Sequence, residues 1–128
     1  VWVNSSKVSQ ILSDATLRQN PHMKPEVIAP GENIISTGIG ETWYSSSGTS
    51  DSTVFVTGAL SLLLEAFPEY KPNSSSNGDC IDQVKLSLMN SSLKYEDTVE
   101  HDNHWGYGQL QAMDWYLDLA VQTPSCSF

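Results

Sequence analysis

Residues 53–67 read TVFVTGALSLLLEAF, and this mostly apolar stretch decides the fold class. Its polar exceptions recur every four residues, at Thr53, Thr57, Ser61 and Glu65. That spacing places them on one narrow stripe of an α-helix, and a helix that is apolar around the rest of its surface must be covered. We therefore predict that this helix ends at Pro68 and is the most buried element. Gly58 weakens the helix by about 1 kcal/mol relative to alanine, so we expect a neighbouring backbone to approach closely there.

Directly before this helix stand Gly48, Thr49 and Ser50, which place a serine at the helix N-terminus. Free backbone N–H groups and the helix dipole favour negative charge at that end. A serine nucleophile there would have donors ready for the oxyanion that it generates. Serine is also a preferred capping residue, so this feature alone leaves a structural role open.

Further upstream, residues 21–37 are punctuated by proline and glycine. The β-branched runs 26–29 and 33–37 between them predict short strands, whereas the Gly/Ser-rich residues 39–49 predict a loop.

Downstream of the apolar helix, Asp79 is the expected N-cap of an amphipathic helix that closes near Asn90. Residues 91–107 are predicted to form a loop, and a last helix is expected to open at Gly108. Three helices and a few short strands do not make a complete α/β layer structure, so we expect the remainder upstream or on a partner.

Composition limits the functions that this chain can serve. Its 128 residues are enough for one core, with 39% hydrophobic residues and a net charge of −9. Fifteen acidic against six basic side chains disfavour binding to nucleic acid or to an anionic membrane surface. No apolar run approaches the roughly 18 residues of a membrane span.

Two features bear on the compartment. Cys80 and Cys126 are either one disulfide of an exported protein or two unrelated thiols. Asn-Ser-Ser glycosylation sequons occur at Asn4, Asn73 and Asn90, although serine richness also explains them. Together these features favour an extracellular or cell-surface location.

Four motifs in order resemble those of subtilisin-like serine proteases, the subtilase family. Residues 24–37 (KPEVIAPGENIIST) are similar to the family's K-P-[DE]-V-x-A-P-G-x-x-I-x-S-T stretch, and residues 47–50 (SGTS) to its nucleophile motif. Residues 88–92 (LMNSS) resemble its L-x-N-T-A helix end, and residues 106–112 (GYGQLQA) its G-x-G-x-[VI]-[ND]-A close. Gly58 falls on the family's helix glycine. The resemblance runs from about Lys24 to Ala120.

This resemblance implies an α/β fold, with residues 1–128 as the C-terminal part of a three-layer α/β/α subtilisin-like domain that has a mainly parallel sheet. It implies a serine endopeptidase that cleaves polypeptides without a cofactor or metal. The resemblance implies that Ser50 is the nucleophile and that its own backbone N–H is one donor to the oxyanion. Gly48 and Thr49 are expected to lie near the site.

The family's catalytic His and Asp and its oxyanion Asn precede this segment. The histidines of this chain do not stand in the family's His motif; they are His22, His101 and His104. A serine hydroxyl is a poor nucleophile without a base. We therefore expect the chain alone to be inactive, and the missing groups to come from the N-terminal remainder of the domain or a partner chain.

Asp51 departs from the family pattern, which has a small or apolar residue after the serine. An ionised carboxylate there would repel the developing oxyanion. Either Asp51 points away and serves the helix N-terminus, which we favour, or it is protonated at an acidic working pH. A catalytically inactive binding or structural homologue is the alternative.

Two other groups of residues are weaker candidates for a site. An acidic cluster could hold Ca²⁺, but it lacks the EF-hand pattern and is better explained as a solvated loop. Its members are Glu96, Asp97, Glu100, His101, Asp102 and His104. Trp43 and Tyr44 could line a peptide cleft, whereas Trp105 and Trp115 are expected to pack in the interior.

Overall fold

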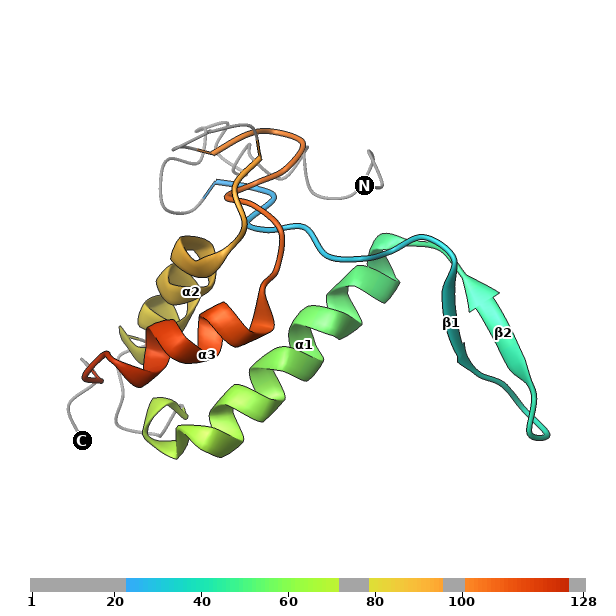
Figure 1. The fold of residues 1–128 in the computed structure, drawn as a ribbon, viewed down its shortest axis with the longest axis horizontal. Coiled ribbons are helices and arrows are strands. Elements are labelled where there is room, and N and C mark those ends of the chain that lie inside the picture. Colours follow the sequence, from blue (N-terminus) through green and yellow to red (C-terminus); the bar gives the residue numbers. More distant parts are fainter. Residues whose placement is uncertain (1–22, 72–78, 96–100, 125–128) are drawn as a thin grey trace, which may run out of the picture.

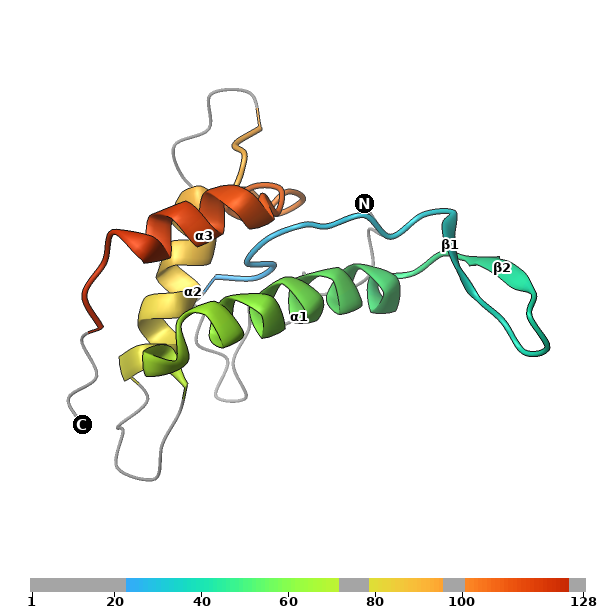
Figure 2. The same ribbon diagram turned by 60° about the horizontal axis from the view of Figure 1, so that its bottom comes forward.

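A computed structural model describes residues 23–71, 79–95 and 101–124. Its elements in chain order are β1 (Ile34–Thr37), β2 (Trp43–Ser46), α1 (Thr49–Ala66), the 3₁₀ turn η2 (Pro68–Tyr70), α2 (Asp79–Ser91) and α3 (Ala112–Ala120). The helices α2 and α3 lie beside the C-terminal half of α1, while the β1–β2 hairpin projects beyond its N-terminal end (Figures 1 and 2). The start of α1 is therefore the junction between the hairpin and the helices.

The hairpin corrects one prediction, because β2 lies inside the stretch 39–49 that the sequence predicted to be loop. The two strands pair antiparallel, with Ile34 opposite Ser46 and Thr37 opposite Trp43. Aromatic residues favour strands, and the glycines of this stretch lie outside β2: Gly40, with a φ of 71°, is in the turn between the strands, and Gly48 directly precedes α1.

The main helix is confirmed, and it extends four residues further toward the N-terminus than residue 53. Its predicted polar stripe is real, since three hydroxyls bond back along it to the carbonyl four residues earlier. These bonds run from Thr53 to Thr49, Thr57 to Thr53 and Ser61 to Thr57, each at 2.9 Å. The helix ends before Pro68, which opens η2.

The burial of α1 contradicts the prediction that it is the most buried element. Only Leu63 is buried, at 4% exposure, whereas Val54 and Leu62 are each 69% exposed. A β-carbon on Gly58 would meet nothing within 4 Å, so the expected close backbone approach is absent from the described residues. The reason is that α2 and α3 contribute to the core on one side of α1 only.

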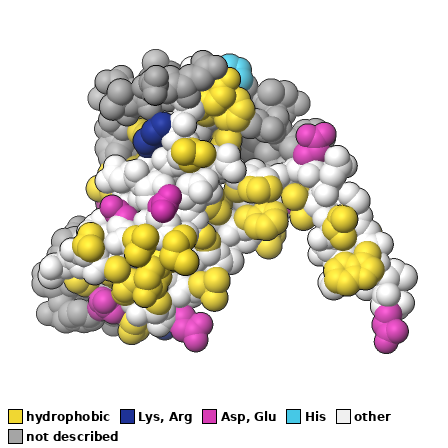
Figure 3. Space-filling view, in the orientation of Figure 1, with side chains coloured by type: hydrophobic (Ala, Val, Ile, Leu, Met, Phe, Trp, Pro, Cys, Tyr) yellow, Lys and Arg dark blue, Asp and Glu magenta, His cyan; other side chains and the backbone are white. Residues whose placement is uncertain are grey.

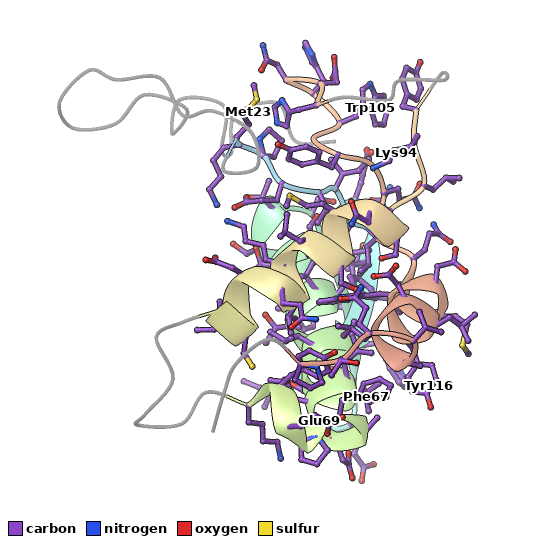
Figure 4. The ribbon with its side chains drawn as sticks, turned by 90° about the vertical axis from the view of Figure 1, so that its left-hand side faces the viewer. Met23, Phe67, Glu69, Lys94, Trp105 and Tyr116 are labelled. Atoms are coloured by element: carbon purple, nitrogen blue, oxygen red, sulfur yellow. The ribbon has the colours of Figure 1, made fainter. Side chains whose placement is uncertain are left out.

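The core forms where α2, α3, η2 and the second half of α1 meet. It consists of Leu63, Tyr70, Cys80, Val84, Leu88, Trp115 and Leu119. Trp115 is 1% exposed and donates its indole N–H to the Val84 carbonyl at 3.2 Å, which confirms its packing role. Phe67 lies beside Tyr116 at the C-terminal end of α1, with ring centroids 5.0 Å apart (Figure 4).

Helix α2 confirms the predicted helix and closes at Ser91, but Asp79, the expected N-cap, is already its first helical residue. Its Cys80 is in a disulfide, and the chain's one other cysteine, Cys126, lies outside the described residues. Asn90 is exposed at the end of α2, whereas the sequons at Asn4 and Asn73 also lie outside the described residues.

Helix α3 begins at Ala112 rather than at the predicted Gly108. The backbone of residues 108–110 instead bonds to the segment around Ile28. The Ile28 N–H donates to the Gly108 carbonyl at 3.0 Å, and the Leu110 N–H donates to the Ile28 carbonyl at 2.9 Å. Gly108 has a φ of 133°, and a β-carbon on it would lie 2.4 Å from the Leu93 carbonyl oxygen. These contacts exclude a helical backbone at Gly108.

Within the described ranges, the sheet is small and antiparallel. The strand expected at residues 26–29 is reduced to one parallel bridge between Ile28 and Gln109. Helices with a two-stranded sheet are compatible with part of a subtilisin-like α/β domain. None of the helices in the described part is long and apolar enough to cross a membrane.

Candidate active site

Ser50 is the second residue of α1 and is exposed to solvent. The Gly48 carbonyl accepts from Asp51 at 3.2 Å and from Ser52 at 3.4 Å, which starts the helix. The N–H groups of Thr49 and Ser50 therefore precede the first helical hydrogen bonds, where a helix has unpaired donors. This position can support an oxyanion on a group that reacts with Ser50.

The turn that carries Ser50 is held by the segment 29–33, which belongs to the first of the family-like motifs. Gly48 donates to the Gly31 carbonyl at 2.7 Å, and Asn33 donates to the Ser47 hydroxyl at 2.8 Å. From the first turn of α1, the Ser52 hydroxyl donates to the Ala29 carbonyl at 2.9 Å. These three bonds join the first motif to the Ser50 motif and to the first turn of α1, and we call them the turn clasp.

Gly31 is the tightest point of the turn clasp. A β-carbon there would lie 2.2 Å from the Ser52 hydroxyl oxygen and 2.7 Å from the Gly48 carbonyl oxygen. The second of these atoms is backbone, which cannot move without shifting the start of α1. Glycine is therefore required at this position because the turn that carries Ser50 approaches it so closely.

Asp51 lies in the first turn of α1 and is half-buried. Its Oδ1 accepts a hydrogen bond of 2.6 Å from the Ser46 hydroxyl at the end of β2. Its Oδ2 lies 3.5 Å from the position of a β-carbon built on Gly48. The carboxylate thus folds back over the turn before the helix, where a negative charge is favoured by the helix dipole.

A cavity of about 490 Å³ separates the hairpin from the first half of α1. Its walls include Ile34, Ile35, Tyr44, Val54 and Phe55, and Asp51 is the one charged residue among those that line it. Figure 3 shows hydrophobic side chains on both the hairpin and α1. Tyr44 therefore lies on a cavity wall as a cleft residue would, while Trp43 is 72% exposed on the same strand.

The described members of the acidic cluster lie in a local turn. Asp102 accepts from the backbone N–H groups of His104 at 2.6 Å and Trp105 at 2.9 Å. The hydrogen bond from His104 is the main cause of the lowered pKa of Asp102. No group of residues that could hold a metal ion occurs in the described ranges, and Glu96, Asp97 and Glu100 lie outside them.

The histidines are not partners of Ser50 in the described part of the chain. His101 Nε2 lies 2.9 Å from the Pro25 carbonyl oxygen, and its ring packs against Tyr107 with centroids 5.0 Å apart. His104 is exposed near Asp102, and His22 lies outside the described residues. Trp105 stacks on Tyr95, with ring centroids 4.3 Å apart.

Sequence reasoning missed one ion-pair network, which anchors the first motif. Glu26 pairs with Lys24 and with Lys85 of α2, the latter at 2.7 Å, and its side chain is only 16% exposed. Burial acts to raise the pKa of Glu26, but the hydrogen bonds and charges of Lys24 and Lys85 outweigh it, and this pKa is lowered overall. The one sequence feature that could have indicated this network is the acidic residue Glu26 next to Lys24 and Pro25 in the first motif.

Ser50 is thus an exposed hydroxyl in the first turn of a helix, directly after the turn at Gly48. The sequence model of the subtilase family of peptidases matches residues 2–108. The chain belongs to the subtilase family.

Individual relatives agree with this assignment. The chain is 31% identical over 103 residues to serine protease AprX of Bacillus subtilis. This match covers 70% of the chain and 21% of AprX. It is 30% identical over 84 residues to C5a peptidase of Streptococcus pyogenes, covering 66% of this chain and 7% of that protein.

A solved structure, that of the CspB protease of Clostridium perfringens, matches with a TM-score of 0.66 and 25% identity. This match covers 84% of the chain and 23% of the CspB chain. The chain thus spans about a fifth of AprX and of the CspB structure, and less of C5a peptidase.

Proposed function

We propose that the chain is the nucleophile-bearing C-terminal part of a subtilisin-like serine endopeptidase domain. The observation that carries this proposal is the placement of Ser50, exposed in the first turn of α1 and presented by Gly48 and Thr49. Membership of the subtilase family and the protease relatives support a peptidase over other serine hydrolases.

In the proposed reaction, Ser50 Oγ attacks the carbonyl carbon of a peptide bond while a histidine base removes its proton. The oxyanion forms beside the N-terminus of α1, where backbone donors can stabilise it. The histidine then protonates the leaving amine, and water releases the acyl group from Ser50. Gly31 and the turn clasp keep the serine at this helix terminus throughout the cycle.

The base, its orienting aspartate and the oxyanion asparagine come from the N-terminal remainder of the protease domain or from a partner chain. Two features support this part of the proposal. Neither described histidine hydrogen-bonds to Ser50, and the apolar side chain of Leu62 on α1 is 69% exposed. We propose that the missing part completes a three-layer α/β/α domain with a mainly parallel sheet and covers this face of α1.

We also propose that the whole protein acts on polypeptides outside the cell or at its surface. The name of one matched relative, minor extracellular protease Vpr of Bacillus subtilis, places that protein outside the cell. The disulfide at Cys80 supports the same compartment here, since such bonds persist in oxidising environments. A catalytically inactive subtilisin-like binding or structural domain is the second candidate, favoured by the carboxylate of Asp51 next to Ser50.

A fluorophosphonate probe on the full-length parent tests the proposal. We expect covalent labelling at Ser50 and hydrolysis of a polypeptide substrate, both lost in Ser50→Ala. Ser61→Ala is the matched control, because its hydroxyl lies on the exposed polar stripe of the same helix. Equal labelling of the parent and Ser50→Ala would contradict the assignment, and absence of labelling in a folded parent would favour the inactive homologue.

A further inference from the structure

The carboxylate of Asp51 has no counter-ion in the described part of the chain. The ion pairs there join Glu26 to Lys24 and Lys85, and His104 to Asp102. The hydrogen bond from the Ser46 hydroxyl and the helix dipole stabilise the carboxylate, but neither supplies a formal positive charge. A negative charge therefore stands one residue from the candidate nucleophile with no cation from residues 23–71, 79–95 and 101–124.

The cavity beside Asp51 has the chemistry of a site for a long cationic side chain. Its hairpin wall contributes Ile34, Ile35 and Tyr44, its helix wall contributes Val54 and Phe55, and Asp51 supplies the one charge. Lysine and arginine place their methylene stems along apolar surfaces while the charged head keeps a polar partner. An acidic side chain of a substrate would instead meet like charge in this cavity.

A substrate bound for cleavage would bring such a side chain within reach. The scissile carbonyl carbon has to lie about 3–3.5 Å from Ser50 Oγ, and the Cα atoms of Ser50 and Asp51 are about 3.8 Å apart as neighbours in the chain. Lysine carries its charge on a flexible stem of about four carbons. A residue that flanks the scissile bond can therefore place its charged end at the Asp51 carboxylate.

We propose that Asp51 is a specificity-determining residue, which binds the lysine or arginine side chain of a polypeptide substrate residue flanking the scissile bond. This inference rests on the proposed endopeptidase function. The pairing would also cancel the charge of Asp51 when the oxyanion forms at Ser50. Because that benefit is largest in the transition state, the preference should appear in kcat as well as in KM.

The test uses the full-length parent and pairs of peptides that carry lysine or the uncharged N-acetyl-lysine on either side of the cleaved bond. We expect kcat/KM to be about tenfold higher for the lysine peptide, which corresponds to about 1.4 kcal/mol. Asp51→Asn should abolish this difference, and Asp51→Lys should invert it in favour of glutamate. Glu41→Gln, at an exposed position of the hairpin turn, is the charge-matched control and should keep the lysine preference.

Two results would overturn the inference and leave the proposed function standing. One is a parent that cleaves both peptides of each pair equally, and the other is a lysine preference that survives in Asp51→Asn. Fluorophosphonate labelling of Ser50 is measured in each variant to show that the nucleophile still reacts. A change in the lysine preference can then be separated from damage to the active site. A parent that is neither labelled nor able to cleave any peptide overturns both proposals.

Discussion

The Ser46 hydroxyl donates a 2.6 Å hydrogen bond to Oδ1 of Asp51, which links the end of β2 to the first turn of α1. The residues between them form the turn that presents Ser50. The bond holds the carboxylate on the hairpin side of this turn, next to Gly48, and so defines where a negative charge stands relative to the candidate nucleophile.

Asp51→Asn should raise kcat of the full-length parent toward an uncharged substrate. An ionised carboxylate about 4 Å from the oxyanion would cost about 4 kcal/mol at an effective dielectric constant of about 20, close to the roughly 3–4 kcal/mol that an oxyanion donor supplies. The substitution removes this charge, and we expect a gain smaller than that limit because the hydrogen bond from Ser46 holds the carboxylate on the hairpin side of the turn. Values of kcat for the parent and the variant, measured with one uncharged substrate, check this. An unchanged kcat would leave Asp51 as a helix-terminus residue with no part in the chemistry.

Gly31→Ala should reduce both stability and turnover. The added methyl group would lie 2.7 Å from the Gly48 carbonyl oxygen, so that the turn clasp or the start of α1 must shift. Overpacking of this kind costs about 1–3 kcal/mol. Thermal unfolding and kcat of the parent are the measurements, and Ile39→Ala is the control because Ile39 is 98% exposed. An unchanged kcat in Gly31→Ala would show that the clasp does not position Ser50.

Leu62→Ala tests whether α1 is covered in the complete domain. Leu62 is 69% exposed in this chain, so the substitution would be nearly neutral if nothing further packs on it. If the N-terminal remainder covers this face, we expect a loss of about 2–5 kcal/mol from the unfolding free energy of the parent. Denaturant unfolding compares Leu62→Ala with Ile39→Ala. Equal, small effects of the two substitutions would contradict the proposed three-layer domain.

Glu26→Gln should lower stability at neutral pH but not in acid. The pKa of Glu26 is lowered in the folded chain below the usual value of a glutamate, so its ion pairs stabilise the protein at neutral pH, where the carboxyl is ionised in both states. This contribution disappears as the pH falls through the lowered pKa of the folded state. We expect a loss of about 1–3 kcal/mol at pH 7, measured by unfolding across the pH range. The exposed Glu65→Gln is the control, and a pH-independent loss in Glu26→Gln would contradict the electrostatic explanation.

Local sequence determined the long helices. The four-residue recurrence of Thr53, Thr57 and Ser61 defined the solvent stripe of α1, because those hydroxyls bond within the helix itself. The spacing of apolar residues that predicted α2 is likewise a property of residues close together in the sequence. Ser50 could be placed at a helix terminus from its position before this pattern, and the family could be recognised from four motifs in order.

Only the tertiary structure decided the remaining features, because they depend on contacts between distant segments. Gly108 is held out of α3 by backbone bonds to Ile28, and β2 exists because β1 pairs with it. The exposure of α1 follows from what packs on it, which its own apolar sequence does not specify. In the same way, the sequence put Asp51 beside Ser50, but only folding brought Ser46 and the segment 29–33 against that turn, where they set the direction of the carboxylate.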